Sequence, residues 1–217
     1  MNPLPLSPHV FTHEGWLYTR NLTPGIQVYT EKLMEDGTAE YRSWNPHKSK
    51  LCAGILNGLQ TFPFTTTSTV LYLGAASGTT ASHISDILTE GIVYCVEFSP
   101  RTGRELVFTC ESRKNMVPIL ADASQPHTYS DLITAVDIIY QDIAQPNQSD
   151  ILRQNCLFLK EGGYAYICIK SRSIDVTAEP STIFKKELKA ISQFLHVTER
   201  IPLEPYEKDH LMIVGKK

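Results

Sequence analysis

The chain has 217 residues, of which 42% are hydrophobic and 20% charged, as in an ordinary soluble globular protein with one medium domain and a small appendage. Its proline-rich start lacks a basic region, and no apolar run approaches the ~20 residues of a membrane span, so we expect neither a signal peptide nor a membrane association. The formal net charge of −3 lacks the basic excess of proteins that hold nucleic acid alone.

The cysteines indicate a reduced protein. Their number is odd, and they never occur at Cys-x-x-Cys spacing. Most of them lie inside apolar stretches, which favours buried thiols over disulfide bridges or metal ligands. We therefore expect no metal site, and a reducing compartment such as the cytoplasm. The cysteines are Cys52, Cys95, Cys110, Cys156 and Cys168.

Residues 1–44 are expected to form a small antiparallel β subdomain. Apolar and polar residues alternate roughly in two segments, and turn signals rich in Gly, Pro or Asp accompany them. The expected strands span residues 9–18 and 27–33, and the turns residues 23–25 and 35–37.

A helix is expected to follow at once. Asn45 is a favourable N-cap, and Pro46 suits the first helical position. Apolar residues then recur at helical spacing. They are Leu51, Ile55, Leu56 and Leu59.

From residue 68 onward, β-rich runs alternate with helical patterns. This alternation predicts a Rossmann-like α/β domain over residues 45–217, with a seven-stranded, mostly parallel sheet covered on both faces and closed by an antiparallel hairpin. The expected strands span residues 69–73, 92–98, 116–120, 136–142, 164–170, 196–203 and 211–215. The expected helices include residues 84–88, 104–113, about 148–159 and about 181–195.

Three successive strands end in residues that suit an adenosine cofactor. Gly74 and Gly78 follow the first strand, in a turn where a backbone without Cβ atoms allows a ligand to approach closely. Glu97 ends the second strand, where a carboxylate can accept hydrogen bonds from two ribose hydroxyls. Asp122 ends the third, where it can receive an adenine amino group. Ligands bind at this edge of open α/β sheets.

This motif has two alternative explanations. Ordinary βα turns with polar caps also contain glycine, but the ordered series of Gly, Glu and Asp makes this explanation less favourable. A nicotinamide-binding dehydrogenase requires Gly-x-Gly-x-x-Gly, and Ala76 occupies its middle glycine. S-adenosylmethionine has no pyrophosphate and tolerates this residue, so the pattern favours a class I methyltransferase.

The acceptor is predicted to be a hydroxyl group. Many amino-group methyltransferases carry Asn/Asp-Pro-Pro-aromatic after the fourth strand, and residues 141–146 do not match it. A hydroxyl needs a nearby base. Asp142 and Lys170 end neighbouring strands, Lys50 precedes the sheet, and His210 opens the last strand. A poorly solvated lysine beside another cation has a lowered pKa and can serve as that base. Each residue has an alternative role as a solvated strand terminus.

Together these segments resemble the fibrillarin family, and in particular its archaeal fibrillarin-like form. The resemblance runs from about Asn21 to the end of the chain. It is carried by Tyr41-Arg42-x-Trp44-Asn45-Pro46-x-x-Ser49-Lys50-Leu51, Tyr72-Leu73-Gly74-x-Ala76-Ser77-Gly78-Thr79-Thr80-Ala81-Ser82-His83, Val96-Glu97-Phe98-Ser99-Pro100-Arg101, Ile119-Leu120-Ala121-Asp122-Ala123, Asp142-Ile143-Ala144-Gln145-Pro146 and Ile169-Lys170-Ser171-Arg172-Ser173-Ile174-Asp175.

The resemblance implies both a catalytic set and a cofactor site. The implied catalytic residues are Lys50, Asp142, Lys170 and His210. The expected S-adenosylmethionine contacts include the residues of the glycine turn. They are Gly74, Ala76, Ser77, Gly78, Thr79, Thr80, Glu97, Phe98, Asp122, Ala123, Asp142, Ile143, Ala144 and Gln145.

The resemblance also implies partners: a box C/D guide RNA, a Nop-domain scaffold protein and a kink-turn-binding protein of ribosomal type. Targets would be ribosomal RNA and, as a second class, transfer RNA. This division of labour accounts for the missing basic excess, because guide pairing and the scaffold position the substrate. The glycine- and arginine-rich tail of eukaryotic members is not seen here, which favours an archaeal, cytoplasmic protein over a nucleolar one.

The predicted function is 2′-O-methylation of RNA ribose, with a role in rRNA processing. Our hypothesis is that Lys170, oriented by Asp142, takes the 2′ proton, while Lys50 and His210 position the sugar. Two alternatives stay open: methylation of protein glutamine, and a non-catalytic assembly factor of the ribonucleoprotein that keeps the fold for its surface.

Overall fold

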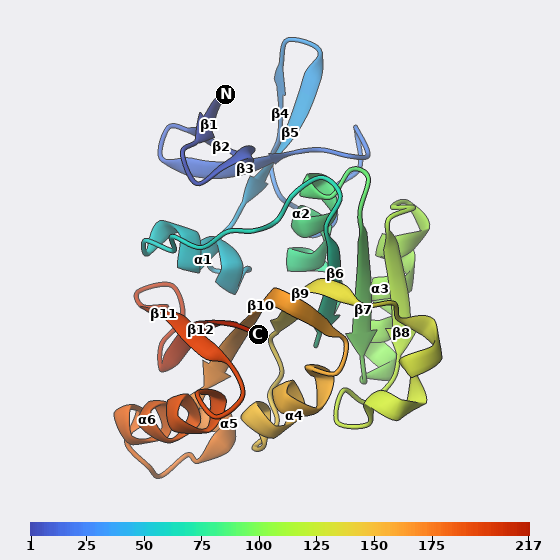
Figure 1. Cartoon of the computed structure of the whole chain (residues 1–217). Helices are drawn as coiled ribbons and strands as arrows, with labels where there is room; N and C mark the ends of the chain where they lie inside the picture. Colours follow the sequence, from blue (N-terminus) through green and yellow to red (C-terminus); the bar gives the residue numbers. More distant parts are fainter.

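The computed structural model describes residues 1–217 and contains two β-sheets (Figure 1). The first is antiparallel, with the strand order β1-β2-β3-β5-β4. Its strands are β1 (Asn2–Leu4), β2 (Ser7–His13), β3 (Trp16–Arg20), β4 (Leu33–Asp36) and β5 (Ala39–Trp44). Figure 1 shows this sheet stacked on the end of the molecule that holds α2.

The expected single strand over residues 9–18 is wrong, because a hairpin interrupts it. Glu14 and Gly15 both have positive φ, 49° and 80°, which is the backbone of a tight two-residue turn. The strand expected over 27–33 is also wrong. The Glu31 carboxylate accepts hydrogen bonds from the backbone of Val28 and Tyr29, so this segment closes on itself as a loop.

Helix α1 (Lys50–Leu56) begins later than expected. Asn45 is not its N-cap, because its side chain accepts a hydrogen bond from the backbone of His47 in a turn that precedes the helix. Ser49 is the N-cap instead, and its hydroxyl accepts a hydrogen bond from the backbone of Cys52. Lys50 is therefore the first helical residue.

The second sheet confirms the predicted fold class. Its order is β11-β12-β10-β9-β6-β7-β8, with β12 antiparallel to both neighbours and the remaining pairs parallel. Its strands are β6 (Thr69–Leu73), β7 (Ile92–Glu97), β8 (Met116–Leu120), β9 (Val136–Gln141), β10 (Leu159–Lys170), β11 (His196–Pro202) and β12 (His210–Lys216). Most strand ends agree with expectation, but β10 starts earlier.

Helices cover both faces of this sheet (Figure 1). They are α2 (Thr79–Ile87), α3 (Pro100–Glu111), α4 (Gln148–Asn155), α5 (Ser171–Ile174) and α6 (Pro180–Ile191), with short 3₁₀ turns at Pro126–Thr128 and Ser130–Leu132. None of them combines the length and apolarity that a membrane crossing requires.

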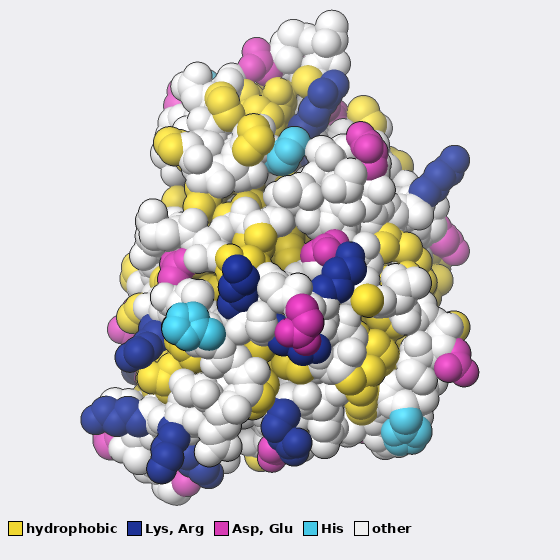
Figure 2. Space-filling view, viewed as in Figure 1, with side chains coloured by type: hydrophobic (Ala, Val, Ile, Leu, Met, Phe, Trp, Pro, Cys, Tyr) yellow, Lys and Arg dark blue, Asp and Glu magenta, His cyan; other side chains and the backbone are white.

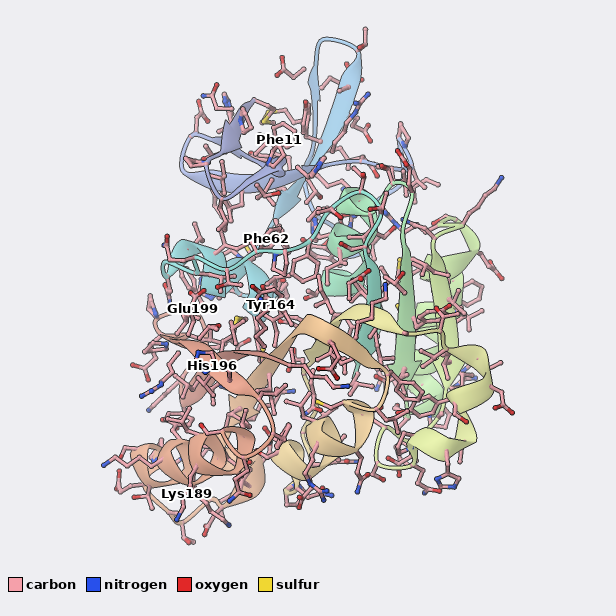
Figure 3. All side chains as sticks on the ribbon, viewed as in Figure 1. Phe11, Phe62, Tyr164, Lys189, His196 and Glu199 are labelled. Atoms are coloured by element: carbon pink, nitrogen blue, oxygen red, sulfur yellow. The ribbon has the colours of Figure 1, made fainter.

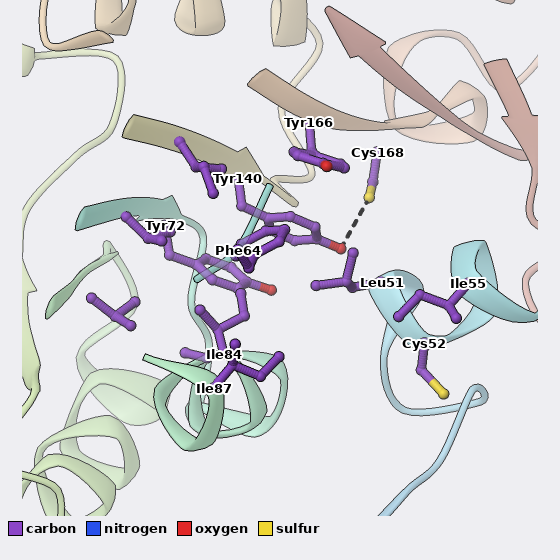
Figure 4. Packing of buried hydrophobic residues seen from close by; sticks show 14 of the residues in the cluster. Leu51, Cys52, Ile55, Phe64, Tyr72, Ile84, Ile87, Tyr140, Tyr166 and Cys168 are labelled. Atoms are coloured by element: carbon purple, nitrogen blue, oxygen red, sulfur yellow. Dashed lines mark hydrogen bonds between the residues drawn. The ribbon is translucent and has the colours of Figure 1, made fainter. Parts of the chain in front are cut away.

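Two hydrophobic clusters hold these layers together, one of 29 and one of 23 buried residues. The larger joins the sheet to α1, α2 and the N-terminal sheet. In it, rings from three adjacent strands lie side by side: Tyr72 and Tyr140 are 4.7 Å apart between centroids, and Tyr166 follows at 6.2 Å (Figure 4). The five cysteines are buried and free, as expected.

A buried ionic network connects the N-terminal sheet to the second sheet. Arg42 on β5 contacts Glu31 at 2.6 Å and Asp86 on α2 at 2.8 Å, and Arg113 contacts Asp86 at 2.6 Å. These side chains are fully buried, and each charge has an opposite partner, which offsets the cost of removing it from water.

Figures 2 and 3 show the same side of the molecule, on which Figure 3 labels Tyr164 and Glu199. Lysine, arginine and acidic side chains are interspersed over this face and form no continuous basic surface (Figure 2). Asp142 directly follows β9, and Lys170 is the last residue of β10. Both therefore lie at the edge of the sheet where these strands end.

Candidate active site

A cavity of about 360 Å³ opens at the carboxyl ends of the central strands. This is the edge at which open α/β sheets bind ligands. Acidic, aromatic and small residues line it together with one lysine. The lining residues are Gly74, Ala76, Val96, Glu97, Phe98, Ser99, Thr102, Ala121, Ala123, Asp142, Ile143, Ala144, Gln145 and Lys170.

The glycine turn after β6 needs its glycine. Gly74 has a φ of +81°, and a Cβ atom there would lie 2.6 Å from the carbonyl oxygen of Asp142. Ala76 also has a positive φ, 49°, and its N–H donates to Oε2 of Glu97 at 2.8 Å. The turn is thus held against the ends of both β7 and β9.

Glu97 is fixed at the cavity wall by two backbone hydrogen bonds. Oε2 accepts from Ala76 and Oε1 accepts from the N–H of Ser99, each at 2.8 Å. A carboxylate has about four lone-pair sites, so both oxygens keep capacity for a ligand hydroxyl. Phe98 lines the cavity beside it and is 68% exposed, so its ring is free to pack against a ligand.

Asp122 lies beside the cavity, between two alanines that line it. Burial opposes ionisation of its carboxyl group. Hydrogen bonds from Ser124, and others with Gln145 and Gln125, outweigh burial and lower its pKa. The group is therefore a stable acceptor at neutral pH.

Asp142 lies between two lysines. Its Oδ2 is 3.1 Å from Nζ of Lys50, and its Oδ1 is 2.8 Å from Nζ of Lys170. The three side chains are only 13–18% exposed. Burial alone would raise the pKa of Asp142, but the two ammonium groups outweigh it and lower the pKa. The cluster holds two positive charges and one negative charge at the cavity.

A lowered pKa, expected for a poorly solvated lysine beside another cation, is not found at Lys50. Burial does lower the pKa of this amine, but the charge of Asp142, then Cys168 and Glu207, outweigh it and raise the pKa above its usual value. The Glu207 carboxylate lies 3.8 Å away. Lys50 is therefore a fixed ammonium group.

His210 is opposite Lys170 in the β10–β12 register. Its Nδ1 lies 2.6 Å from the carbonyl oxygen of Lys208. Since a carbonyl only accepts, Nδ1 carries the proton and Nε2 is left as an acceptor in the neutral ring. The preceding residue, Asp209, has a φ of +60°, and its carbonyl accepts from the Ser171 hydroxyl at 3.0 Å. His210 is thus held next to Lys170, outside the cavity lining.

Comparison with known proteins assigns the family, because the fibrillarin family matches residues 8–217. The chain belongs to the fibrillarin family. A fibrillarin-like rRNA/tRNA 2′-O-methyltransferase of Thermococcus sibiricus is 55% identical over 201 residues, 92% of this chain and 89% of that protein. The resemblance expected from the sequence motifs is confirmed.

Solved fibrillarin structures share the fold closely. Aeropyrum pernix fibrillarin, in complex with natively bound S-adenosyl-L-methionine, has a TM-score of 0.91 and 42% identity, and covers 99% of this chain and 96% of that one. The fibrillarin of a fibrillarin/Nop5p complex has a TM-score of 0.89 and 43% identity, with 95% and 96% covered.

Several residues of this chain that were predicted to contact the cofactor do not line the cavity. They are Ser77, Gly78, Thr79, Thr80 and Asp122. Thr80 instead donates its hydroxyl to that of Ser49 at 2.9 Å, in the interface between α1 and α2. The carbonyl of Ser77 accepts from Thr109 on α3 at 3.0 Å. Ser77 and Thr80 thus contact α3 and the start of α1 instead of the cavity.

The sequence did not predict four residues that line the cavity, or the charged residue Glu207 beside Lys50. Val96, Ser99, Thr102 and Ala121 line the cavity. Ser99 had a readable signal, because Ser followed by Pro100 is an N-cap with Pro at the first helical position. It starts α3 directly at the end of β7. Glu207 had none, because it lies in the loop before β12.

Proposed function

We propose that this chain is an S-adenosylmethionine-dependent methyltransferase that modifies the 2′-hydroxyl of ribose in rRNA and tRNA. The observation that carries the proposal is the Asp142 carboxylate held between Lys50 and Lys170 at the mouth of a cofactor-sized cavity, in a chain of the fibrillarin family. Residues 45–217 would form the catalytic domain and residues 1–44 the β subdomain.

The cavity suits S-adenosylmethionine in shape and charge. Glu97 would accept the ribose hydroxyls, and Asp122 the adenine amino group. Phe98 and Ala123 would flank the adenine ring. Gly74 leaves room that a side chain would fill. The acidic wall matches a cofactor whose sulfonium and amino groups are positive. The bound cofactor supplies an electrophilic methyl group.

The chain's own residues would manage one proton and one developing charge. A 2′-hydroxyl is a weak nucleophile, so a positioned base speeds its attack. Lys170, oriented by Asp142, would take the 2′ proton. The ammonium group of Lys50 would stabilise negative charge on the ribose oxygen. Nε2 of His210 would accept a hydrogen bond from the sugar.

The enzyme would work as the catalytic subunit of a box C/D ribonucleoprotein. The solved fibrillarin/Nop5p complex supports a Nop-domain scaffold as one partner. A guide RNA and a kink-turn-binding protein would complete the particle, in the cytoplasm. The net charge of −3 supports this division, because a lone RNA-binding enzyme needs basic groups to neutralise phosphates.

The decisive experiment measures cofactor binding and methylation separately. S-adenosylmethionine is titrated by calorimetry, and a Kd of tens of micromolar or tighter is expected, comparable with the roughly 1 μM–1 mM range of enzyme KM values. Methylation of a target RNA is then assayed with scaffold, kink-turn-binding protein and guide RNA present or individually omitted. Turnover should require the complete particle. A chain that binds no cofactor would be an assembly factor, and peptide-glutamine methylation without RNA methylation would show the other alternative.

A further inference from the structure

We infer that Gln148 is a positioning residue for methyl transfer: its buried amide holds the backbone of Lys170 and so fixes that amine against Asp142. The inference rests on the proposed function, and it names a residue outside the cavity and outside the charged cluster.

The sheet leaves the end of β10 without a strand partner on one side. Pairing of β10 with β9 ends at Ile167, opposite Gln141, whereas pairing with β12 continues to Lys170. The Gln148 side chain occupies the open side. Its Oε1 accepts from the N–H of Lys170 at 3.1 Å, and its Nε2 donates to the Lys170 carbonyl at 3.3 Å. One amide thus bonds both backbone groups of Lys170, as a neighbouring strand does.

The same glutamine is tied to the residue before Asp142. Nε2 of Gln141 donates to the backbone carbonyl of Gln148 at 2.8 Å. Nζ of Lys170 then returns to Asp142, 2.8 Å from its carboxylate and 3.3 Å from its carbonyl oxygen. Gln148, Lys170, Asp142 and Gln141 are thus linked in a closed ring. The ring holds both partners of the Lys170–Asp142 ion pair in place. Both glutamines are fully buried.

The geometry distinguishes this role from simple support of α4. Gln148 makes both of its side-chain hydrogen bonds to Lys170 and none within its own helix. The helix is packed independently through Ile151 and Leu152, which are fully buried. A lysine side chain has four rotatable bonds, so its amine occupies one position only where its contacts with Asp142 and its backbone are both held. A shift of about 1 Å at a reacting group can reduce turnover about 100-fold.

The test replaces Gln148 in the assembled particle. Gln148→Met keeps the length of the side chain and removes both hydrogen bonds, so we expect kcat to fall about 100-fold. The KM for target RNA and the calorimetric Kd for S-adenosylmethionine should stay within about twofold, because Gln148 contacts neither ligand. Gln148→Glu keeps the acceptor for the Lys170 N–H and should restore part of kcat. It also serves as the test variant if Gln148→Met does not fold.

A matched control separates positioning from stability. The Asn115 amide donates to the carbonyls of Ser85 and Leu88 and accepts from the Ser85 hydroxyl, far along the sheet at β8. Asn115→Leu should lower Tm and leave kcat unchanged at temperatures where the protein is folded. The inference is overturned if folded Gln148 variants keep wild-type kcat, or lose it only as Asn115→Leu does. If wild-type particles themselves do not methylate RNA, the proposed function fails instead.

Discussion

Nζ of Lys50 lies 3.1 Å from Oδ2 of Asp142, although 92 residues separate them in the chain. Lys50 is brought there by the start of α1. Its N-cap, Ser49, accepts a hydrogen bond from the Thr80 hydroxyl on α2, which fixes the first turn of α1 beside the glycine turn. The charged cluster therefore joins a helix that precedes the sheet to the ends of two sheet strands.

Asp142→Asn should abolish most methylation. The asparagine has the same shape, but it leaves two ammonium groups close together without a counter-ion and can no longer orient the Lys170 amine. We expect turnover in the assembled particle to fall at least about 100-fold, the lower end of the contribution of a positioned acid–base group. Transfer of labelled methyl groups to guided RNA measures it.

Asp150→Asn is the matched control for this change. Asp150 is 65% exposed and pairs only with Arg153 on the same helix, at 3.5 Å. Surface pairs of this kind contribute little to stability. The control should methylate at the wild-type rate. Wild-type turnover in Asp142→Asn would show that the carboxylate does not organise the site.

Lys170→Ala should separate cofactor binding from chemistry. The substitution removes the proposed base and leaves the cavity walls at Gly74, Glu97 and Phe98 intact. Calorimetry should still detect S-adenosylmethionine binding, while single-turnover methylation falls at least about 100-fold. Lys160→Ala, at an exposed lysine that pairs with Asp137, should have no effect on either. Undiminished turnover in Lys170→Ala would eliminate the base assignment.

His83 should make the stability of the protein depend on pH. Its ring is fully buried between Thr19 and Tyr29, whose hydroxyls lie 2.7 and 2.6 Å from its nitrogens. Burial, and then the charges of Arg42 and Arg113, lower its pKa well below the usual value of about 6.5. The unfolded chain binds this proton more readily than the folded protein. The free energy of unfolding should therefore keep its highest value, as far as His83 is concerned, above about pH 6.5. It should decrease as the pH falls below that value.

Tm measured between about pH 5.5 and 7.5 tests this linkage. The range stays more than about one unit above the usual carboxyl pKa values near 4, so the acidic residues contribute little to the slope. His83→Gln can keep a hydrogen bond to Thr19 and cannot be protonated. Its Tm should vary less with pH than that of the wild type. Parallel curves for the two proteins would show that His83 is not the source of the acid sensitivity.

The sequence predicted those parts of the site that local chemistry determines. Gly74, Glu97 and Asp142 lie at or just after strand ends, and strand ends follow from apolar runs and turn residues. Ser49 was missed because Asn45-Pro46 has the stronger local signal, whereas the position of α1 is decided by contact with Thr80. Gln148 gave no signal, since its function depends on β9 ending before β10 does. Glu31 folds residues 28–31 into a loop through contacts that no periodicity reveals.

Gly74→Ala tests the close approach of the glycine turn to Asp142. Gly74 has a φ of +81°, and an added Cβ would lie 2.6 Å from the Asp142 carbonyl and 2.8 Å from Ile143. The backbone after β9 must then move, which shifts the carboxylate relative to Lys50. Gly25 has the same φ of +81° with nothing within 4 Å, so Gly25→Ala carries the backbone strain without the clash. Strain alone costs about 1–2 kcal/mol.

The two alanine variants should therefore differ in function as well as in stability. Gly25→Ala should lower Tm by a few degrees and keep both cofactor affinity and turnover. Gly74→Ala should lower Tm further, weaken S-adenosylmethionine binding and reduce methylation. The displaced Asp142 turn lines the cavity, and its carboxylate pairs with both Lys50 and Lys170. Calorimetry and the particle assay on both variants give the comparison. If Gly74→Ala bound S-adenosylmethionine as tightly as Gly25→Ala, the turn would tolerate a side chain, and Gly74 would be needed only for its left-handed backbone.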